Sequence, residues 1–172
     1  MFESINELDK FIYDDCQITD IKLTDNNLII TLEALIVGAR NSQNSNYTES
    51  YADTTTVELR SAKINSIMIE GYKQYDASDN LIEEVPDTPV PETEYADTIS
   101  KMVNGFMFTA ECTEKTSSNT PNGASFTYVF EVDMDVANEY GLQDPYCTTY
   151  QLEVSFSESR VTWDRYLNRV QK

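Results

Sequence analysis

Alternation of apolar and polar residues over residues 126–135 constrains the fold of this chain more than any other feature of its sequence. Thr127, Glu131 and Asp133 separate the apolar positions, and only Val129 breaks the polar side of the pattern. A period of two residues is typical of a β-strand with one buried face. We therefore predict that the following side chains of this strand face the core: Phe126, Tyr128, Phe130, Val132 and Met134.

Similar segments elsewhere predict a chain built mainly of strands. Residues 146–156 repeat the alternation, and residues 16–23 and 28–37 flank the polar sequence Thr24-Asp25-Asn26-Asn27, which is typical of a hairpin turn. Three prolines within residues 86–91 exclude a central strand there and predict an extended connector. The other predicted strands cover residues 54–62, 64–75, 81–85 and 106–112.

Helical spacing is confined to short segments. Ser4 and Glu7 match a capping box and precede apolar residues at helical intervals, which predicts a helix over about residues 4–13. A second short helix is expected from Tyr95 to the Asn104-Gly105 pair. Near the C-terminus, four apolar residues at positions i, i+3, i+4 and i+7 predict an amphipathic helix: Trp163, Tyr166, Leu167 and Val170.

Together these elements predict a mainly β fold that is α+β by its helix content. We expect about seven or eight antiparallel strands in a sandwich or a curved, barrel-like sheet. The short N- and C-terminal helices are expected to cover an edge or an open end of that sheet. At 172 residues, a single domain over residues 1–172 is expected.

The cysteines and the N-terminal residues favour a cytoplasmic protein. The first residues are acidic and lack the apolar run of a secretory signal, and no apolar stretch is long enough to cross a bilayer. Cys16, Cys112 and Cys147 are odd in number and widely spaced, so we expect reduced thiols that act as small apolar fillers. Cys112 is in phase with Phe106 and Phe108, which predicts that its thiol is buried.

Composition excludes several classes of function. The chain has 30 acidic and 12 basic residues, a net charge of −18 and no histidine. Such a charge repels nucleic acid and anionic membranes, so neither is expected as a partner. Without histidine, Ser-His-Asp and Cys-His catalysis and His-ligated zinc are excluded. No nucleophile or general base stands out, so no catalytic residue is assigned and an enzyme is not expected.

The distribution of charge suggests the leading function. No basic residue lies between Lys73 and Lys101 or within residues 116–159, whereas bases return in the last thirteen residues. We therefore expect a non-enzymatic binding protein whose acidic surface engages a basic partner protein, as an immunity or inhibitor protein or an assembly component would. On the predicted C-terminal helix, the candidate interaction residues are Trp163, Arg165, Tyr166 and Arg169.

Two alternatives stay open. A small-ligand carrier would enclose an aromatic-lined cavity in a curved sheet, although the same side chains could simply fill a core. Its candidate lining residues are Phe106, Phe108, Phe126, Tyr128, Phe130 and Tyr150.

The second alternative is a metal-dependent hydrolase. Clustered carboxylate and amide oxygens suit calcium or magnesium, but the segment lacks the spacing and the glycine of an EF-hand loop. No other cofactor is expected. The candidate ligands are Asp133, Asp135, Asn138 and Glu139.

Overall fold

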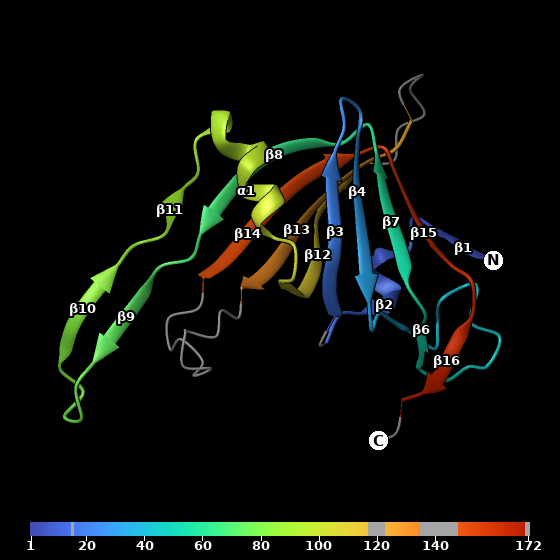
Figure 1. Ribbon diagram of the computed structural model, residues 1–172, viewed down its shortest axis with the longest axis horizontal. Coiled ribbons are helices and arrows are strands. Elements are labelled where there is room, and N and C mark those ends of the chain that lie inside the picture. Colours follow the sequence, from blue (N-terminus) through green and yellow to red (C-terminus); the bar gives the residue numbers. More distant parts are fainter. Residues whose placement is uncertain (15, 117–122, 135–147, 171–172) are drawn as a thin grey trace.

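Ten strands form the main sheet of this protein, whose computed structural model describes residues 1–14, 16–116, 123–134 and 148–170. All neighbouring strands are antiparallel, in the order β1-β15-β7-β4-β3-β12-β13-β14-β8-β11 (Figure 1), so the predicted mainly β, antiparallel fold is confirmed. The strands are β1 (Phe2–Ile5), β3 (Cys16–Leu23), β4 (Asn27–Glu33), β7 (Thr55–Arg60), β8 (Lys63–Ile69), β11 (Thr88–Pro89), β12 (Phe106–Thr116), β13 (Ser125–Met134), β14 (Thr148–Phe156) and β15 (Glu158–Trp163).

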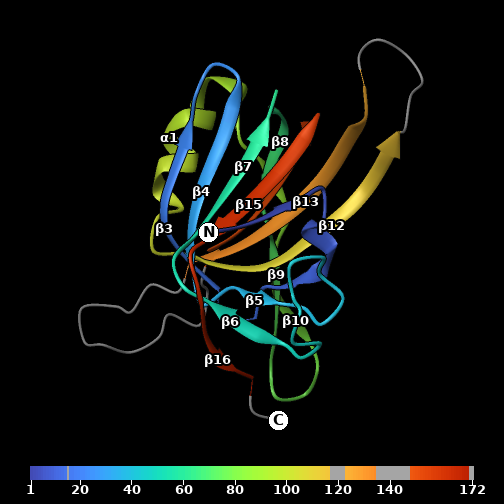
Figure 2. The ribbon, with the colours of Figure 1, turned by 90° about the vertical axis from the view of Figure 1, so that its right-hand side faces the viewer.

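The main sheet is open. Its edge strands β1 and β11 pair with β15 and β8 and not with each other, so the sheet does not close into a barrel. At its centre, β3 and β12 are joined through two residue pairs, Gln17 with Phe106 and Cys16 with Met107. This short seam separates a first half, β1-β15-β7-β4-β3, from a second half, β12-β13-β14-β8-β11 (Figure 2). The predicted number of about seven or eight strands is too low.

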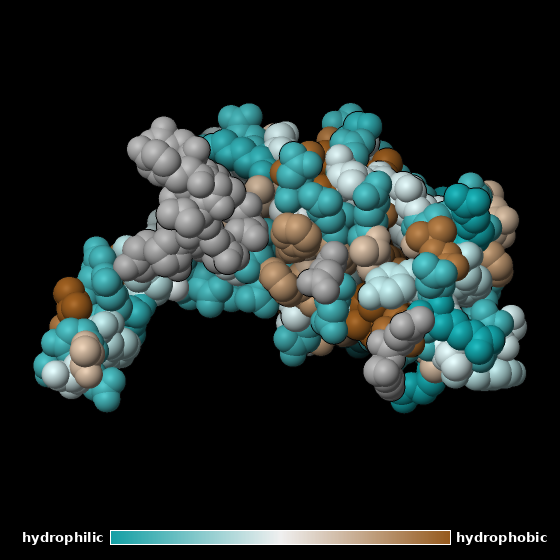
Figure 3. All heavy atoms as spheres, turned by 60° about the horizontal axis from the view of Figure 1, so that its bottom comes forward, coloured by the Kyte–Doolittle hydropathy of each residue, from teal (hydrophilic) through white to brown (hydrophobic). Residues whose placement is uncertain are grey.

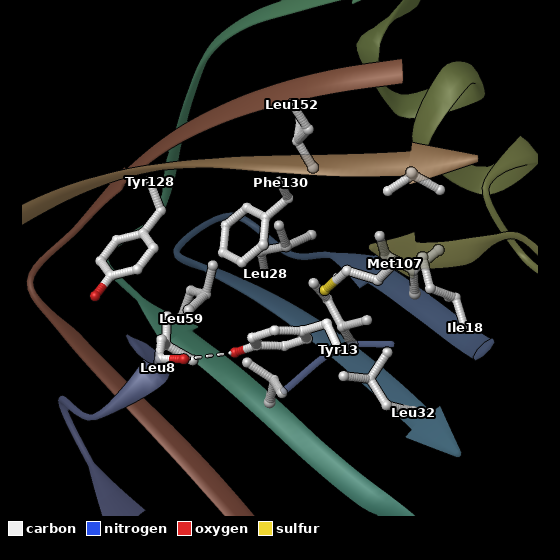
Figure 4. Close-up of a cluster of buried hydrophobic side chains, with 14 of the residues drawn as sticks. Leu8, Tyr13, Ile18, Leu28, Leu32, Leu59, Met107, Tyr128, Phe130 and Leu152 are labelled. Atoms are coloured by element: carbon white, nitrogen blue, oxygen red, sulfur yellow. Dashed lines mark hydrogen bonds between the residues drawn. The ribbon is translucent and has the colours of Figure 1, made fainter. Parts of the chain in front are cut away.

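Buried side chains from both halves meet in one hydrophobic core. In Figure 4, Leu28 and Leu59 of the first half lie opposite Tyr128 and Phe130 of the second half. The Tyr13 hydroxyl donates a hydrogen bond of 3.0 Å to the Leu8 carbonyl oxygen, which satisfies a polar group that would be costly to bury alone.

The predicted alternation of β13 is confirmed in this core. Phe126, Tyr128, Phe130 and Val132 are buried and Met134 is half-buried, because inward and outward residues alternate along the strand. The next strand, β14, repeats the pattern and pairs with β13 throughout its length.

Two smaller sheets accompany the main one. The first has the order β16-β6-β5-β2 and lies beside the first half of the main sheet (Figure 2). The second is a hairpin of two strands that projects from the body of the protein (Figure 1), and we call residues 72–85 the arm. The strands are β2 (Phe11–Ile12), β5 (Ile36–Val37), β6 (Ser50–Ala52), β16 (Tyr166–Arg169), β9 (Tyr72–Tyr75) and β10 (Leu81–Val85).

A glycine marks the root of the arm. The predicted strand over residues 64–75 is interrupted there, because β8 ends at Ile69 and β9 begins at Tyr72. A Cβ atom at Gly71 would lie 2.0 Å from the Val85 carbonyl oxygen, so only glycine lets the two arm strands approach this closely. The predicted hairpin between β9 and β10 is confirmed, and the proline-rich connector lies at the sheet edge as β11.

The predicted internal helix is also confirmed. It is α1 (Tyr95–Lys101), which follows a 3₁₀ turn over Glu92–Glu94 and buries Ile99 in the core. Asn104 ends this segment with a left-handed φ of 69°, and its N–H donates a hydrogen bond of 2.8 Å to the Ile18 carbonyl oxygen of β3. In the described parts of the chain, none of the helices has the length and apolar character that crossing a membrane requires.

The predicted N-terminal helix over residues 4–13 is wrong. This segment contains β1, a 3₁₀ turn over Leu8–Lys10, and β2. The Ser4 hydroxyl donates a hydrogen bond of 2.7 Å to Glu7 Oε2, so the side-chain contact that suggested a capping box forms without the helix. Pairing of β1 with β15 instead satisfies the backbone and stacks Phe2 on Trp163, with ring centroids 5.4 Å apart.

The predicted C-terminal helix is wrong as well. Trp163 ends β15 and Tyr166 begins β16, so the helical spacing of the apolar residues is interrupted by a turn. The Asp53 carboxylate fixes this turn, because its Oδ1 accepts hydrogen bonds from the backbone N–H groups of Asp164 (3.0 Å) and Arg165 (3.3 Å). Trp163 is 2% exposed and Leu167 is 52% exposed, so the predicted stripe does not lie on one face.

Candidate protein-binding surface

The outer face of the first half neutralises most of its own charge. Glu158 and Arg160 of β15 point outward between the buried residues of that strand, as do Glu58 and Arg60 on the paired strand β7. Arg60 lies 3.3 Å from Glu58 and 3.2 Å from Glu158, and Arg160 lies 2.6 Å from Glu158. Arg160 also reaches Glu3 of β1 at 3.4 Å, and we call these five residues the ion-pair network.

The outer face of the second half is different. Glu131 and Asp133 alternate with buried Phe130 and Val132 on β13 and therefore point outward. Glu70 follows the end of β8, and its N–H donates a hydrogen bond of 2.9 Å to the carbonyl oxygen of Thr149 on β14, between the two strands. Asp87 lies at the other root of the arm. We call this group the acidic face: Glu70, Asp87, Glu131 and Asp133.

Hydrogen bonds hold the carboxylates of the acidic face. The Thr149 hydroxyl donates a hydrogen bond of 2.6 Å to Asp133 Oδ1, and the Thr109 hydroxyl donates one of 3.4 Å to Glu131 Oε2. The Gly71 N–H donates a hydrogen bond of 2.7 Å to Asp87 Oδ1. Neutral donors orient these side chains, but they supply no positive charge.

Like charges therefore act on one another across the acidic face. Partial burial, followed by the negative charges of the other three carboxylates, raises the pKa of Glu70 above its ordinary value. Within the described residues, no ion pair includes Glu70, Asp87 or Glu131. The arm continues this charge with further carboxylates, and its one lysine, Lys73, already lies 3.2 Å from Glu84.

The predicted metal site lies partly on this face. Asp133 is present there, whereas Asp135, Asn138 and Glu139 lie outside the described residues. Among the described residues, no group of three or more His, Cys, Asp or Glu side chains has an arrangement that could hold a metal ion. The metal site therefore stays a prediction.

The six aromatic residues assigned to a carrier cavity have different environments. Phe126, Tyr128, Phe130 and Tyr150 are buried in the core, where they pack on one another and on their neighbours. Phe106 is half-buried, and Phe108 is 42% exposed, so the prediction that Phe108 faces inward is wrong.

A bulge in β12 explains the orientation of Phe108. The pairing of β12 with β13 shifts between Met107 and Thr109, and Met107 takes the buried position. The predicted burial of Cys112 is also wrong, because this cysteine is exposed. Burial of Cys16 is found, and it raises the pKa of that thiol to about 12, which suits a core filler.

The candidate interaction residues near the C-terminus divide into two buried or half-buried aromatics and two exposed bases. Trp163 packs in the core and Tyr166 donates a hydrogen bond of 2.9 Å to the Gln43 carbonyl oxygen, so both hold the small sheet in place. Arg165 lines a groove of about 420 Å³ with Asp53, which lies 3.6 Å from its Nε atom. Arg169 is exposed and lines a neighbouring cavity at the end of β16.

Sequence reasoning did not find Glu70, Asp87 and Glu131. The signal was present in the two segments without basic residues, since Asp87 belongs to the first and Glu131 to the second. Their juxtaposition depends on the pairing of β14 with both β13 and β8, which alternation within single strands does not reveal.

No model of a protein family matches this chain, and no curated protein and no solved structure is significantly similar to it.

Proposed function

We propose that this protein is a non-enzymatic binding protein and that its acidic face engages a basic partner protein. The observation that carries this proposal is the contrast between the two outer faces of one sheet. Arg60 and Arg160 neutralise the carboxylates around them on the first face, whereas Glu70, Asp87 and Glu131 of the acidic face form no ion pair within the described residues.

Electrostatics favours a basic partner for this arrangement. Clustered like charges oppose the folded state, and a positively charged surface that approaches them removes that repulsion. Complementary charge also raises the rate of encounter and gives specificity. An immunity or inhibitor protein for a cationic target, or an acidic assembly component, would use such a surface, and we place this binding in the cytoplasm.

The proposal is tested with a basic peptide of alternating lysine and serine, about twelve residues long. Binding of the labelled peptide is measured by fluorescence anisotropy at about 0.02 M and 0.2 M salt, where screening differs strongly. The variant Glu70→Gln/Asp87→Asn/Glu131→Gln removes three charges from the acidic face. We expect it to weaken binding by about tenfold at the lower salt concentration.

The control variant is Asp14→Asn/Asp25→Asn/Asp164→Asn, which removes the same charge from exposed residues elsewhere. We expect a loss of about twofold or less for this control, because distant charges are screened. An equal loss of affinity in the two variants, or none in either, would show that net charge alone governs binding and would overturn the proposal.

A further inference from the structure

The arm is a separate hairpin beside the acidic face. Its strands β9 and β10 pair with each other and, within the described residues, with no other strand. Figure 1 shows it extending away from the body of the protein. A two-stranded hairpin without a third strand or a packed partner is only marginally stable in water.

The tip of the arm is nevertheless well defined. Asp76 Oδ1 accepts hydrogen bonds from the backbone N–H groups of Ser78 (2.8 Å) and Asn80 (2.9 Å), and Asp79 has a left-handed φ of 61°. The Asp76 N–H donates a hydrogen bond of 2.9 Å to the Asn80 carbonyl oxygen. These bonds build a fixed turn, so the strands that follow present their side chains in a set arrangement.

Large apolar side chains lie exposed beside this turn. Tyr75 and Leu81 are cross-strand partners, with exposed fractions of 53% and 50%. The register shifts between Leu81 and Glu83, so Ile82 is the extra residue of a bulge, and it is 61% exposed. In Figure 3, the brown of apolar residues marks the far end of the arm. Such a group on a projecting element is typical of a contact surface.

The negative charge around these side chains favours a basic partner surface. The arm carries Asp76, Asp79, Glu83 and Glu84 against Lys73, and Lys73 is paired with Glu84. A second copy of this chain brings a net charge of −18 to the contact and is repelled. A basic surface is attracted.

We propose that the arm is a docking element that packs Tyr75, Leu81 and Ile82 against an apolar surface, rimmed by basic side chains, on the partner protein. This inference rests on the proposed function for the sign of the partner's charge. It adds that apolar contact at the arm, and not charge alone, supplies part of the affinity. Burial also orders a hairpin that pairs with no third strand in the described parts of the chain.

The test compares two labelled peptides of equal charge, the lysine–serine peptide above and one of alternating lysine and leucine of the same length. Leucine side chains can cover the apolar residues of the arm while the lysines reach the carboxylates beside them. We expect the intact protein to bind the leucine peptide about tenfold or more tightly than the serine peptide.

The arm variant is Tyr75→Ser/Leu81→Ser/Ile82→Ser. We expect it to bind both peptides equally, with unchanged affinity for the serine peptide. The matched control Ile5→Ser/Leu23→Ser/Leu167→Ser removes three other exposed apolar side chains and should keep the preference for leucine. Hydrogen exchange supplies a second readout, because the amides of β9 and β10 should gain protection when the leucine peptide binds.

The outcomes separate the two proposals. If the leucine preference is absent or survives in the arm variant, the docking inference falls while charge-dependent binding at the acidic face stands. If the leucine preference depends on the arm but the acidic-face variant binds both peptides normally, the proposed function falls instead. Dimerisation at high salt that the arm variant abolishes would assign the arm to a second copy and would also overturn the inference.

Discussion

Two outer faces of the same antiparallel sheet can be compared, one on β7 and β15 and the other on β13 and β8. On both, outward residues alternate along the strands with residues buried in the same core. On the first face, arginine and glutamate side chains lie within 2.6 to 3.4 Å of one another across three strands. On the acidic face, threonine hydroxyls and a backbone N–H orient carboxylates that repel one another.

Under the proposed function, charge on the surface of this protein serves two purposes. The ion-pair network contributes modestly to the stability of the fold, as exposed ion pairs do. The acidic face opposes stability slightly, and we propose that it is retained for binding. The following four predictions test the comparison, beginning with the common core on which it depends.

The largest effect is expected when the core that joins the two halves is disrupted. Phe130→Ala should lower the free energy of unfolding by about 3–5 kcal/mol, because Phe130 is 1% exposed and its removal leaves a cavity. Urea unfolding followed by Trp163 fluorescence and by circular dichroism should give one coincident transition. The control Phe108→Ala, at an exposed residue, should cost less than about 1 kcal/mol. Two separate transitions would break the premise that both faces belong to one cooperative unit.

Glu7 gives the second largest effect and contrasts with Glu70. Burial alone would raise the pKa of Glu7, but hydrogen bonds from Lys10, Ser42 and Ser4 outweigh it and lower the pKa from 4.5 to about 2. A lowered pKa stabilises the fold above pH 4.5, and this contribution is lost as the pH falls toward 2. Glu7→Gln should cost about 1–3 kcal/mol at pH 7 and flatten this part of the pH profile.

Thermal unfolding between pH 2 and pH 7 measures this effect. The raised pKa of Glu70 has the opposite sign, so protonation of Glu70 relieves repulsion in the folded state. If Glu7→Gln left the acid limb of the profile unchanged, the hydrogen-bonded carboxylate would not be the group that titrates.

Removal of both bases from the ion-pair network should make the first face as acidic in character as the acidic face. Arg60→Gln/Arg160→Gln should lower the free energy of unfolding by about 1 kcal/mol, since both side chains are partly exposed and their ion pairs are screened. The variant should also bind the lysine–serine peptide more tightly, because Glu3, Glu58 and Glu158 are then uncompensated. Unchanged affinity would mean that the acidic face has a property beyond charge.

The smallest effect is expected at Glu70. Glu70→Gln should raise the free energy of unfolding at pH 7 by roughly 0.3 kcal/mol, because this exposed group is repelled by its neighbours and solvent screens most of that repulsion. The gain should shrink with added salt. Chemical denaturation at two salt concentrations measures it, with Asp25→Asn as a control that should change nothing. A loss of stability would indicate that the Glu70 carboxylate has a stabilising partner.

Much of the main sheet could be predicted from the sequence because a strand with one buried face has alternating apolar and polar residues. The alternation along β13 and β14, the turn between β3 and β4 and the short helix α1 each depend on neighbouring residues, and all three are present. The bulge after Met107 has no such signal in the sequence, so the predicted orientation of Phe108 was wrong.

The predictions of the two terminal helices were wrong for a related reason. Trp163 and Tyr166 have helical spacing only because the Asp164-Arg165 turn separates two strands, and that turn is held by Asp53, a residue far away in the sequence. Val161 and Trp163, which are both buried, already carried the strand period. The acidic face was missed likewise, because strand pairing and not sequence proximity brings its members together.

The pairing of β1 with β15 also limits when the first half of this sheet can be completed. Ser159 donates a backbone hydrogen bond of 2.9 Å to the Asn6 side chain, although the two residues are 153 positions apart. Since β15 lies between β1 and β7, the first half is complete only after residues 158–163 have been synthesised. The pairings of β12 with β13 and of β13 with β14 join neighbouring segments, whereas the pairing of β1 with β15 closes a loop of about 150 residues, which costs more chain entropy and slows folding.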